Sequence, residues 1–174
     1  MRPVPHIVPL LFMMLGCLAL TISNAQESLE GTYTFVADSS TNIDAAIDAA
    51  VTDMNFIKRP IARSRLKKTN PIYRRIVISR TVQEISVEFR TGAPVITPAD
   101  GTSVKWTRDD GEVFDVSAVW EAATLTQRFK AEDGERLNVF RLAPDGRTLT
   151  LDVTVSSDQL PKPMTYSLVY RRAS

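Results

Sequence analysis

The stretch that decides the fold is residues 114–134, FDVSAVWEAATLTQRFKAEDG, in which largely apolar side chains recur at every second position. The members of this set are Phe114, Val116, Ala118 and Trp120, followed after a short break by Leu125, Gln127 and Phe129. A period of two places them on one face of two extended strands. Asp133-Gly134 closes the stretch with a dipeptide typical of hairpins, because glycine takes the positive φ that a tight turn needs.

The same alternation continues from Arg74 to the end of the chain. Its other apolar runs are Ile76 to Ile78, Ile85 to Phe89, Leu149 to Val155 and Tyr166 to Tyr170. Three more aspartate–glycine pairs lie between such runs, at Asp100-Gly101, Asp110-Gly111 and Asp145-Gly146. We therefore expect four hairpin turns within an antiparallel meander of about nine strands.

Before this meander the sequence predicts one strand and then a helical insert. Residues Gly31–Ala37 form a strand with Tyr33 and Phe35 on one face. Apolar residues then recur in steps of three and four, as on one face of a helix: Ile43, Ala46, Ile47, Ala50, Val51, Met54 and Ile57. Pro60 breaks this helix and starts a second one to about Lys68. The predicted fold is all-β: a single antiparallel meander β-barrel of about ten strands, with a helix-turn-helix insert after the first strand.

This layout resembles the fatty-acid-binding-protein and lipocalin group of calycin-like β-barrels. Gly31-Thr32-Tyr33 is similar to the glycine-x-tryptophan opening of that group, with tyrosine in place of tryptophan. The closing Leu168-Val169-Tyr170-Arg171 is similar to the final strand of fatty-acid-binding proteins, where an arginine that binds a carboxylate stands in the place of Leu168. The resemblance implies a barrel that holds a small apolar or lipid-like ligand beside a helical lid.

The first 25 residues predict export. An uncharged, mainly apolar run from Ile7 to Ile22 follows Arg2, and Ser23-Asn24-Ala25 supplies the small residues that a signal peptidase reads. The run is shorter than the roughly 20 residues of a membrane span. We expect cleavage after Ala25, a mature domain of residues 26–174, and a periplasmic or secreted location. Lipid attachment at Cys17 is the alternative.

Removal of this segment excludes several kinds of chemistry. His6 and Cys17 are the only histidine and cysteine, so the mature chain has no intrachain disulfide, no histidine- or cysteine-based zinc site and no nucleophile–histidine pair. Arg2 is the only charged residue of the segment, so 20 of the 21 basic residues remain beside 20 acidic ones. A chain of zero net charge is not typical of a nucleic-acid binder. We expect no metal, no cofactor and no nucleic-acid partner.

Two groups of residues are candidates for ligand binding. The basic stretch from Lys58 to Arg75 contains no acid, and within it Arg63 and Arg65 lie beside apolar helix positions. This stretch can attract an anionic ligand, make weak contact with an anionic membrane surface, or simply be a solvated helix face. The second group is the inward set of the later strands, whose predicted ligand contacts are Trp106, Gln127 and Tyr170. The aromatic residues of this inward set can line a cavity or fill the barrel.

These patterns favour one function over two others. The first is an exported binding protein for a small apolar or amphipathic ligand, anions included because of the basic lid. The second is an exported structural or protein-interaction barrel with a filled core. An enzyme is the third, and we do not expect it because the acidic pairs, such as Asp109-Asp110, fall in predicted turns. Interior volume separates the first two, and alternation alone does not reveal it.

Overall fold

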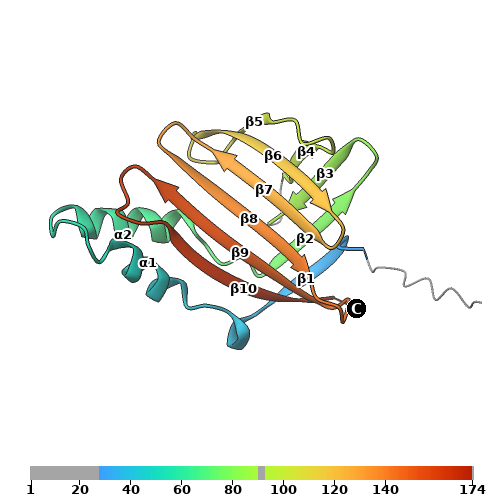
Figure 1. Ribbon diagram of the computed structural model, residues 1–174, viewed down its shortest axis with the longest axis horizontal. Helices are drawn as coiled ribbons and strands as arrows, with labels where there is room; N and C mark the ends of the chain where they lie inside the picture. Colours follow the sequence, from blue (N-terminus) through green and yellow to red (C-terminus); the bar gives the residue numbers. More distant parts are fainter. Residues whose placement is uncertain (1–27, 90–92, 174) are drawn as a thin grey trace, which may run out of the picture.

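The structure, a computed structural model, describes residues 28–89 and 93–173; the predicted signal segment lies outside these ranges. One antiparallel sheet of ten strands curls into a nearly closed barrel, in the order β4-β3-β2-β1-β10-β9-β8-β7-β6-β5 (Figure 1). The predicted all-β fold with a helical insert is confirmed. The strands are β1 (Gly31–Val36), β2 (Arg75–Arg80), β3 (Glu84–Glu88), β4 (Val95–Pro98), β5 (Val104–Thr107), β6 (Val113–Glu121), β7 (Thr124–Lys130), β8 (Gly134–Leu142), β9 (Thr148–Ser157) and β10 (Met164–Arg172).

One of the four predicted hairpin turns is wrong. Asp110-Gly111, Asp133-Gly134 and Asp145-Gly146 join paired strands, as expected. Asp100-Gly101 instead joins β4 to β5, which lie at opposite ends of the sheet order. The local turn is still made, since Gly101 has a φ of 85° and the Thr102 amide donates to the Asp100 side chain at 2.9 Å. The dipeptide determines the turn but not which strands pair beside it.

Two seams close the barrel in different ways. The first is a backbone ladder between β1 and β10, whose register places Phe35 opposite Tyr170. The second lies between β4 and β5, and apolar side chains rather than a ladder fill it. There Val95 of β4 packs in one cluster with Val116 and Phe114 of β6 and Phe129 of β7.

The helical insert has two helices, α1 (Ile43–Val51) and α2 (Lys58–Thr69), which follow a short 3-10 turn, η1 (Ala37–Ser39). The prediction of one helix through Ile57 is wrong, because α1 ends at Val51. After Val51 the chain tightens into a turn, in which the Met54 amide donates to the Val51 carbonyl at 3.0 Å. Asn55 then prepares α2: its side chain accepts from the Ile57 amide at 2.8 Å, and its carbonyl accepts from the Lys58 amide that begins α2. Within the described ranges, no helix has the length and apolarity needed to cross a membrane.

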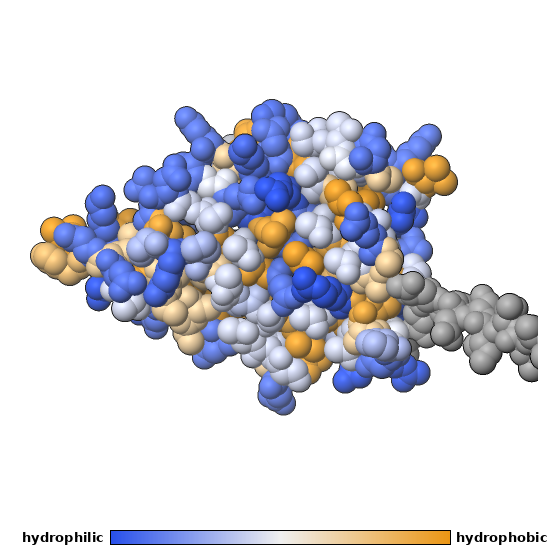
Figure 2. All heavy atoms as spheres, in the orientation of Figure 1, coloured by the Kyte–Doolittle hydropathy of each residue, from blue (hydrophilic) through white to orange (hydrophobic). Residues whose placement is uncertain are grey.

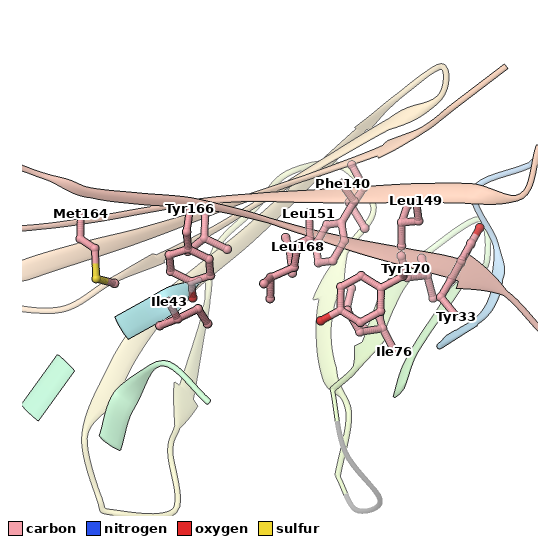
Figure 3. Packing of buried hydrophobic residues seen from close by; sticks show 14 of the residues in the cluster. Tyr33, Ile43, Ile76, Phe140, Leu149, Leu151, Met164, Tyr166, Leu168 and Tyr170 are labelled. Carbon is pink, nitrogen blue, oxygen red and sulfur yellow. The ribbon is translucent and has the colours of Figure 1, made fainter. Parts of the chain in front are cut away.

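The main apolar core runs from the inner face of α1 along β10 to the barrel end farthest from α2. Figure 3 shows Tyr166 beside Ile43, and farther along the same strand Tyr170 beside Ile76. Side chains in this cluster are almost fully withdrawn from solvent; Tyr33, Phe140 and Leu149 are all 0% exposed. Each such burial stabilises the fold by about 1.5–3 kcal/mol.

Arg172 seals the barrel end at which the described chain begins. Its guanidinium lies 5.1 Å from the centroid of the Tyr33 ring and donates to the carbonyls of Ser28 at 2.6 Å and Gly146 at 2.8 Å. Gly31 leaves room for it, since a Cβ there would lie 2.6 Å from the guanidinium. The Gly31-Thr32-Tyr33 opening therefore has a packing role, with the tyrosine ring as the platform for a cation. We call this the closed end.

Candidate functional site

The opposite end of the barrel, beside the helices, contains a cavity of about 550 Å³, and we call it the open end. One wall is α2 and the segment after it, and the other walls are the inward faces of β3 to β9. Another hollow, of about 590 Å³, lies near the closed end beside Arg80 and Trp120. It is a surface depression, and the Val82 side chain in it is 97% exposed. The cavity at the open end is therefore the candidate site.

Aromatic side chains make up the apolar wall of the cavity. The Trp106 ring lies 5.9 Å from that of Phe114 and 5.6 Å from that of Phe129, and Tyr73 contacts Phe89 at 5.2 Å. All five residues line the cavity. The alternation of β5, β6 and β7 turns the three residues of the first group inward, because residues two apart face the same side of a strand. Such a wall suits an apolar ligand body.

A chain of hydrogen bonds crosses the floor of the cavity. It begins at Asn70, at the end of α2, whose Oδ1 accepts from Arg136 at 2.8 Å and from the Tyr166 hydroxyl at 3.2 Å. The Arg136 Nε donates to Asn138 at 2.8 Å, and Asn138 donates to Gln127 at 3.4 Å. Asn70 also donates to the Leu66 carbonyl at 2.9 Å, so the chain ties the end of α2 to the barrel.

Arg136 carries the positive charge of this chain. It lines the cavity, and among the described residues no carboxylate lies within ion-pair distance of it. Two of its five N–H groups donate to the Asn138 and Asn70 amides. The remaining donors and the full charge are available to a polar group inside the cavity.

The other cations around the cavity fall into two kinds. Lys58, Arg65 and Lys68 of α2 line it, and in the described part of the chain they have no ion-pair partner. Arg108 is instead held in a network: it donates to Asp110 at 2.9 Å and also pairs with Glu112. The hydrogen bond from Arg108 lowers the pKa of Asp110 to about 2, and the same bond raises the pKa of the guanidinium. Arg108 is thus committed to the β5–β6 turn.

The five predicted contacts occupy three kinds of position. Arg65 and Trp106 line the cavity. Gln127 and Tyr170 are fully buried in the barrel interior but do not line the cavity. Arg63 lies outside it and pairs with Asp48 of α1 across an exposed surface at 2.5 Å. Their roles in binding stay predictions.

Sequence reasoning missed Arg136 and Asn70. The phase of β8 contained the signal for Arg136, because it alternates with Asn138, Phe140 and Leu142, all of which face inward. Arg141 has the opposite phase and pairs with Asp152 on the outer surface. No local signal marked Asn70, whose partners lie 66 and 96 residues away.

Comparison with known proteins shows the fold. No family model and no curated protein matches the sequence. A fatty-acid-binding protein from Drosophila melanogaster brain tissue superposes with a TM-score of 0.52 and 14% identity, over 83% of this chain and 99% of that chain. The zebrafish ileal bile-acid-binding protein complexed with cholic acid superposes with a TM-score of 0.52 and 10% identity, over 84% of this chain and 100% of that chain. A secretory abundant heat soluble protein from Ramazzottius varieornatus superposes with a TM-score of 0.54 and 11% identity, over 83% of this chain and 94% of that chain. The predicted resemblance to calycin-like barrels is confirmed at the level of the fold.

Proposed function

We propose that this chain binds a small amphipathic ligand, with its apolar body in the 550 Å³ cavity and its polar end at Arg136. One observation carries the proposal: an aromatic-walled cavity contains a guanidinium that, among the described residues, has no carboxylate within ion-pair distance, although carboxylates such as Asp110 and Glu112 also line the cavity. Arg136 is half-buried beside this apolar wall, and the donors that Asn138 and Asn70 do not occupy can bind an anionic group there. A filled barrel has no need of this arrangement.

The names of the similar structures support the same class of ligand. The Drosophila protein is a fatty-acid-binding protein, and the zebrafish protein is complexed with cholic acid. Both ligand classes combine a large apolar body with a carboxylate. The proposal for this chain is therefore binding rather than catalysis, with an anionic amphipath as the preferred ligand. Arg65 and the two α2 lysines at the rim would attract it as it enters.

Export and membrane contact complete the proposal. Residues 1–25 would direct the chain out of the cytoplasm, leaving residues 26–174 as the mature protein. Phe56, Ile57 and Ile61 are 78%, 64% and 69% exposed around the turn between the helices, and Figure 2 shows apolar atoms at this tip of the molecule among charged ones. With Lys58 and Arg59 beside them, these residues suit a weak contact with an anionic membrane. Native mass spectrometry of the exported protein would read its first residue and any retained ligand.

Displacement of a dansyl-labelled undecanoic acid by octadecanoic acid and by octadecanol tests the binding proposal. In Arg136→Met, we expect affinity for the acid to fall about 10- to 100-fold, because a charge-assisted hydrogen bond is worth roughly 1.5–3 kcal/mol. Affinity for the alcohol should change much less. Arg141→Met is the matched control, because Arg141 lies on the same strand but faces outward.

Two results would contradict the proposal in different ways. Unchanged affinity for the acid in Arg136→Met would show that the guanidinium does not bind the carboxylate, and the proposal would then be limited to an apolar ligand. Failure of the wild-type protein to bind the labelled acid, the acid or the alcohol would reject small-molecule binding and favour a barrel that acts through its surface.

A further inference from the structure

The wall of the cavity differs in charge from one side to the other. The α2 side has three cations that, in the described part of the chain, have no ion-pair partner, and Arg136 adds a fourth from β8. The β5–β6 turn instead contributes Arg108 together with the carboxylates of Asp110 and Glu112. These three side chains have two negative charges and one positive charge. A purely anionic ligand group complements only the cationic side of the cavity.

Beside this turn, the cavity wall is the aromatic group of Trp106, Phe114 and Phe129. The Phe129 ring plane is inclined by 86° to that of Phe114 and by 73° to that of Trp106. Steeply inclined rings that meet in this way are typical of the aromatic cages that hold quaternary ammonium groups. The group already holds one cation of the protein itself, because the Arg108 guanidinium lies 5.2 Å from the centroid of the Phe114 ring.

Trp106 is the ring of this group that a ligand reaches most easily. It lines the cavity and is partly exposed, whereas Phe114 and Phe129 are only 8% and 6% exposed. Among the described residues, no cation lies over its indole ring. Tryptophan attracts cations to its ring face more strongly than tyrosine or phenylalanine does. The indole therefore offers an accessible face for a cation next to a turn with a net negative charge.

This indole lies within reach of a ligand group that is bound at Arg136. Phe129 is the register partner of Arg136, and its ring lies 5.6 Å from that of Trp106. The strands of Arg136 and Trp106, β8 and β5, are three strand spacings apart, or roughly 14 Å along the sheet. Both side chains line the cavity from the inside of a curved sheet, so their end groups are closer together than their backbones. One headgroup with two charged parts can span them.

We propose that the ligand has a zwitterionic headgroup, with its anionic group at Arg136 and a quaternary ammonium group against the indole face of Trp106. The inference rests on the proposed function and narrows the ligand class to amphipaths with a phosphocholine-like headgroup. Asp110 and Glu112 favour the ammonium over an uncharged group of the same shape, because their combined charge exceeds that of Arg108. The guanidinium of Arg136 suits the phosphate, to which it can donate more than one hydrogen bond.

Displacement of the same labelled acid by dodecylphosphocholine, below the concentration at which it forms micelles, tests this inference. The comparison ligand is dodecyl neohexyl phosphate, in which a carbon atom replaces the choline nitrogen, so that only the positive charge is lost. We expect the wild-type protein to bind dodecylphosphocholine about tenfold more tightly than this isostere. Trp106→Leu should remove the preference because it removes the π-face, and Glu112→Gln should reduce it because it removes a negative charge. Both variants should still bind octadecanoic acid.

Controls separate this inference from the proposed function. Trp120→Leu changes the other tryptophan, which lines the depression near the closed end and not the cavity, and it should keep the preference of the wild-type protein. Thermal melts show that each variant is folded. Equal affinity for the two phosphodiesters in a wild-type protein that binds octadecanoic acid would overturn the zwitterionic headgroup and leave the proposed function intact. A preference that survives in both Trp106→Leu and Glu112→Gln would overturn it as well. Failure to bind either phosphodiester or any acid would instead reject the proposed function.

Discussion

The two ends of the barrel use the same strands for different purposes, and β8 shows the contrast within nine residues. At the open end its inward residues are Arg136 and Asn138, which line the cavity. At the closed end they are Phe140 and Leu142, which belong to the apolar core. At the closed end, Arg172 donates to the backbone carbonyls of Ser28, near the start of the described chain, and of Gly146, in the turn between β8 and β9. The helices and the cavity lie at the other end.

The contrast teaches that the barrel is neither simply filled nor simply hollow. The closed half contains the large buried side chains and supplies most of the stability, since burial of apolar area dominates folding. The open half contains a half-buried charge and a chain of hydrogen-bonded amides around a cavity, and polar groups in these places contribute less stability than packed apolar side chains. Residues that lower stability and have no clear structural role concentrate at functional sites.

The largest expected effect comes from truncating one aromatic residue at each end. Phe140→Ala should lower the free energy of unfolding by about 3–5 kcal/mol, because it opens a cavity in a packed core. Trp106→Ala should cost no more than about 2 kcal/mol, because that side chain is only partly buried and already faces a cavity, yet it should weaken ligand binding. Urea denaturation monitored by circular dichroism measures both. Equal losses in the free energy of unfolding for the two variants would contradict the distinction between a packed closed end and a hollow open end.

A smaller effect is expected from the arginine that seals the closed end. Arg172→Met should lower the free energy of unfolding by about 2–3 kcal/mol, because the Ser28 and Gly146 carbonyls lose a charged donor and the Tyr33 ring loses its cation. Arg171→Met is the control: this exposed neighbour pairs with Asp145 at 3.8 Å and should change stability by less than about 0.5 kcal/mol. Octadecanoic acid affinity should be the same in both variants, and a loss confined to Arg172→Met would show that the closed end shapes the cavity.

The smallest effect concerns one turn carboxylate at each end. Hydrogen bonds from Thr148 lower the pKa of Asp145 to about 2, and Arg108 lowers that of Asp110 to about 2. In the unfolded chain both titrate near 3.9, so they contribute stability above about pH 4 that is lost as pH falls towards 2. Asp145→Asn and Asp110→Asn should each flatten this part of the profile of Tm against pH.

Salt distinguishes the two turns. The contribution of Asp110 depends on an ion pair and should shrink at high salt, whereas that of Asp145 depends mainly on uncharged donors, with Arg171 as the smallest cause, and should shrink much less. The same salt dependence in both variants would contradict the causes assigned to the two pKa values.

Much of the fold could be predicted from local patterns, and the errors share one cause. The period of two located most of the strands from β2 to β10, but not β4 or β8, and the change to steps of three and four located α1. The errors, at Asp100-Gly101 and at the end of α1, arose where a local signal does not determine what comes next. Arg65 and Trp106 were placed beside the cavity by the same patterns, whereas Asn70 joins the site through partners that only chain folding brings near.

The sequence by itself determined the faces of the strands, the helical insert and the absence of histidine and cysteine after residue 17. These properties depend on backbone periodicity and residue type, which act over a few neighbouring positions. Only the tertiary structure decided that one half of the interior is packed and the other hollow, and that Arg136 rather than Arg63 faces the cavity. The volume between inward side chains depends on how far apart the opposite walls stand, and that distance is set by closure of the whole barrel.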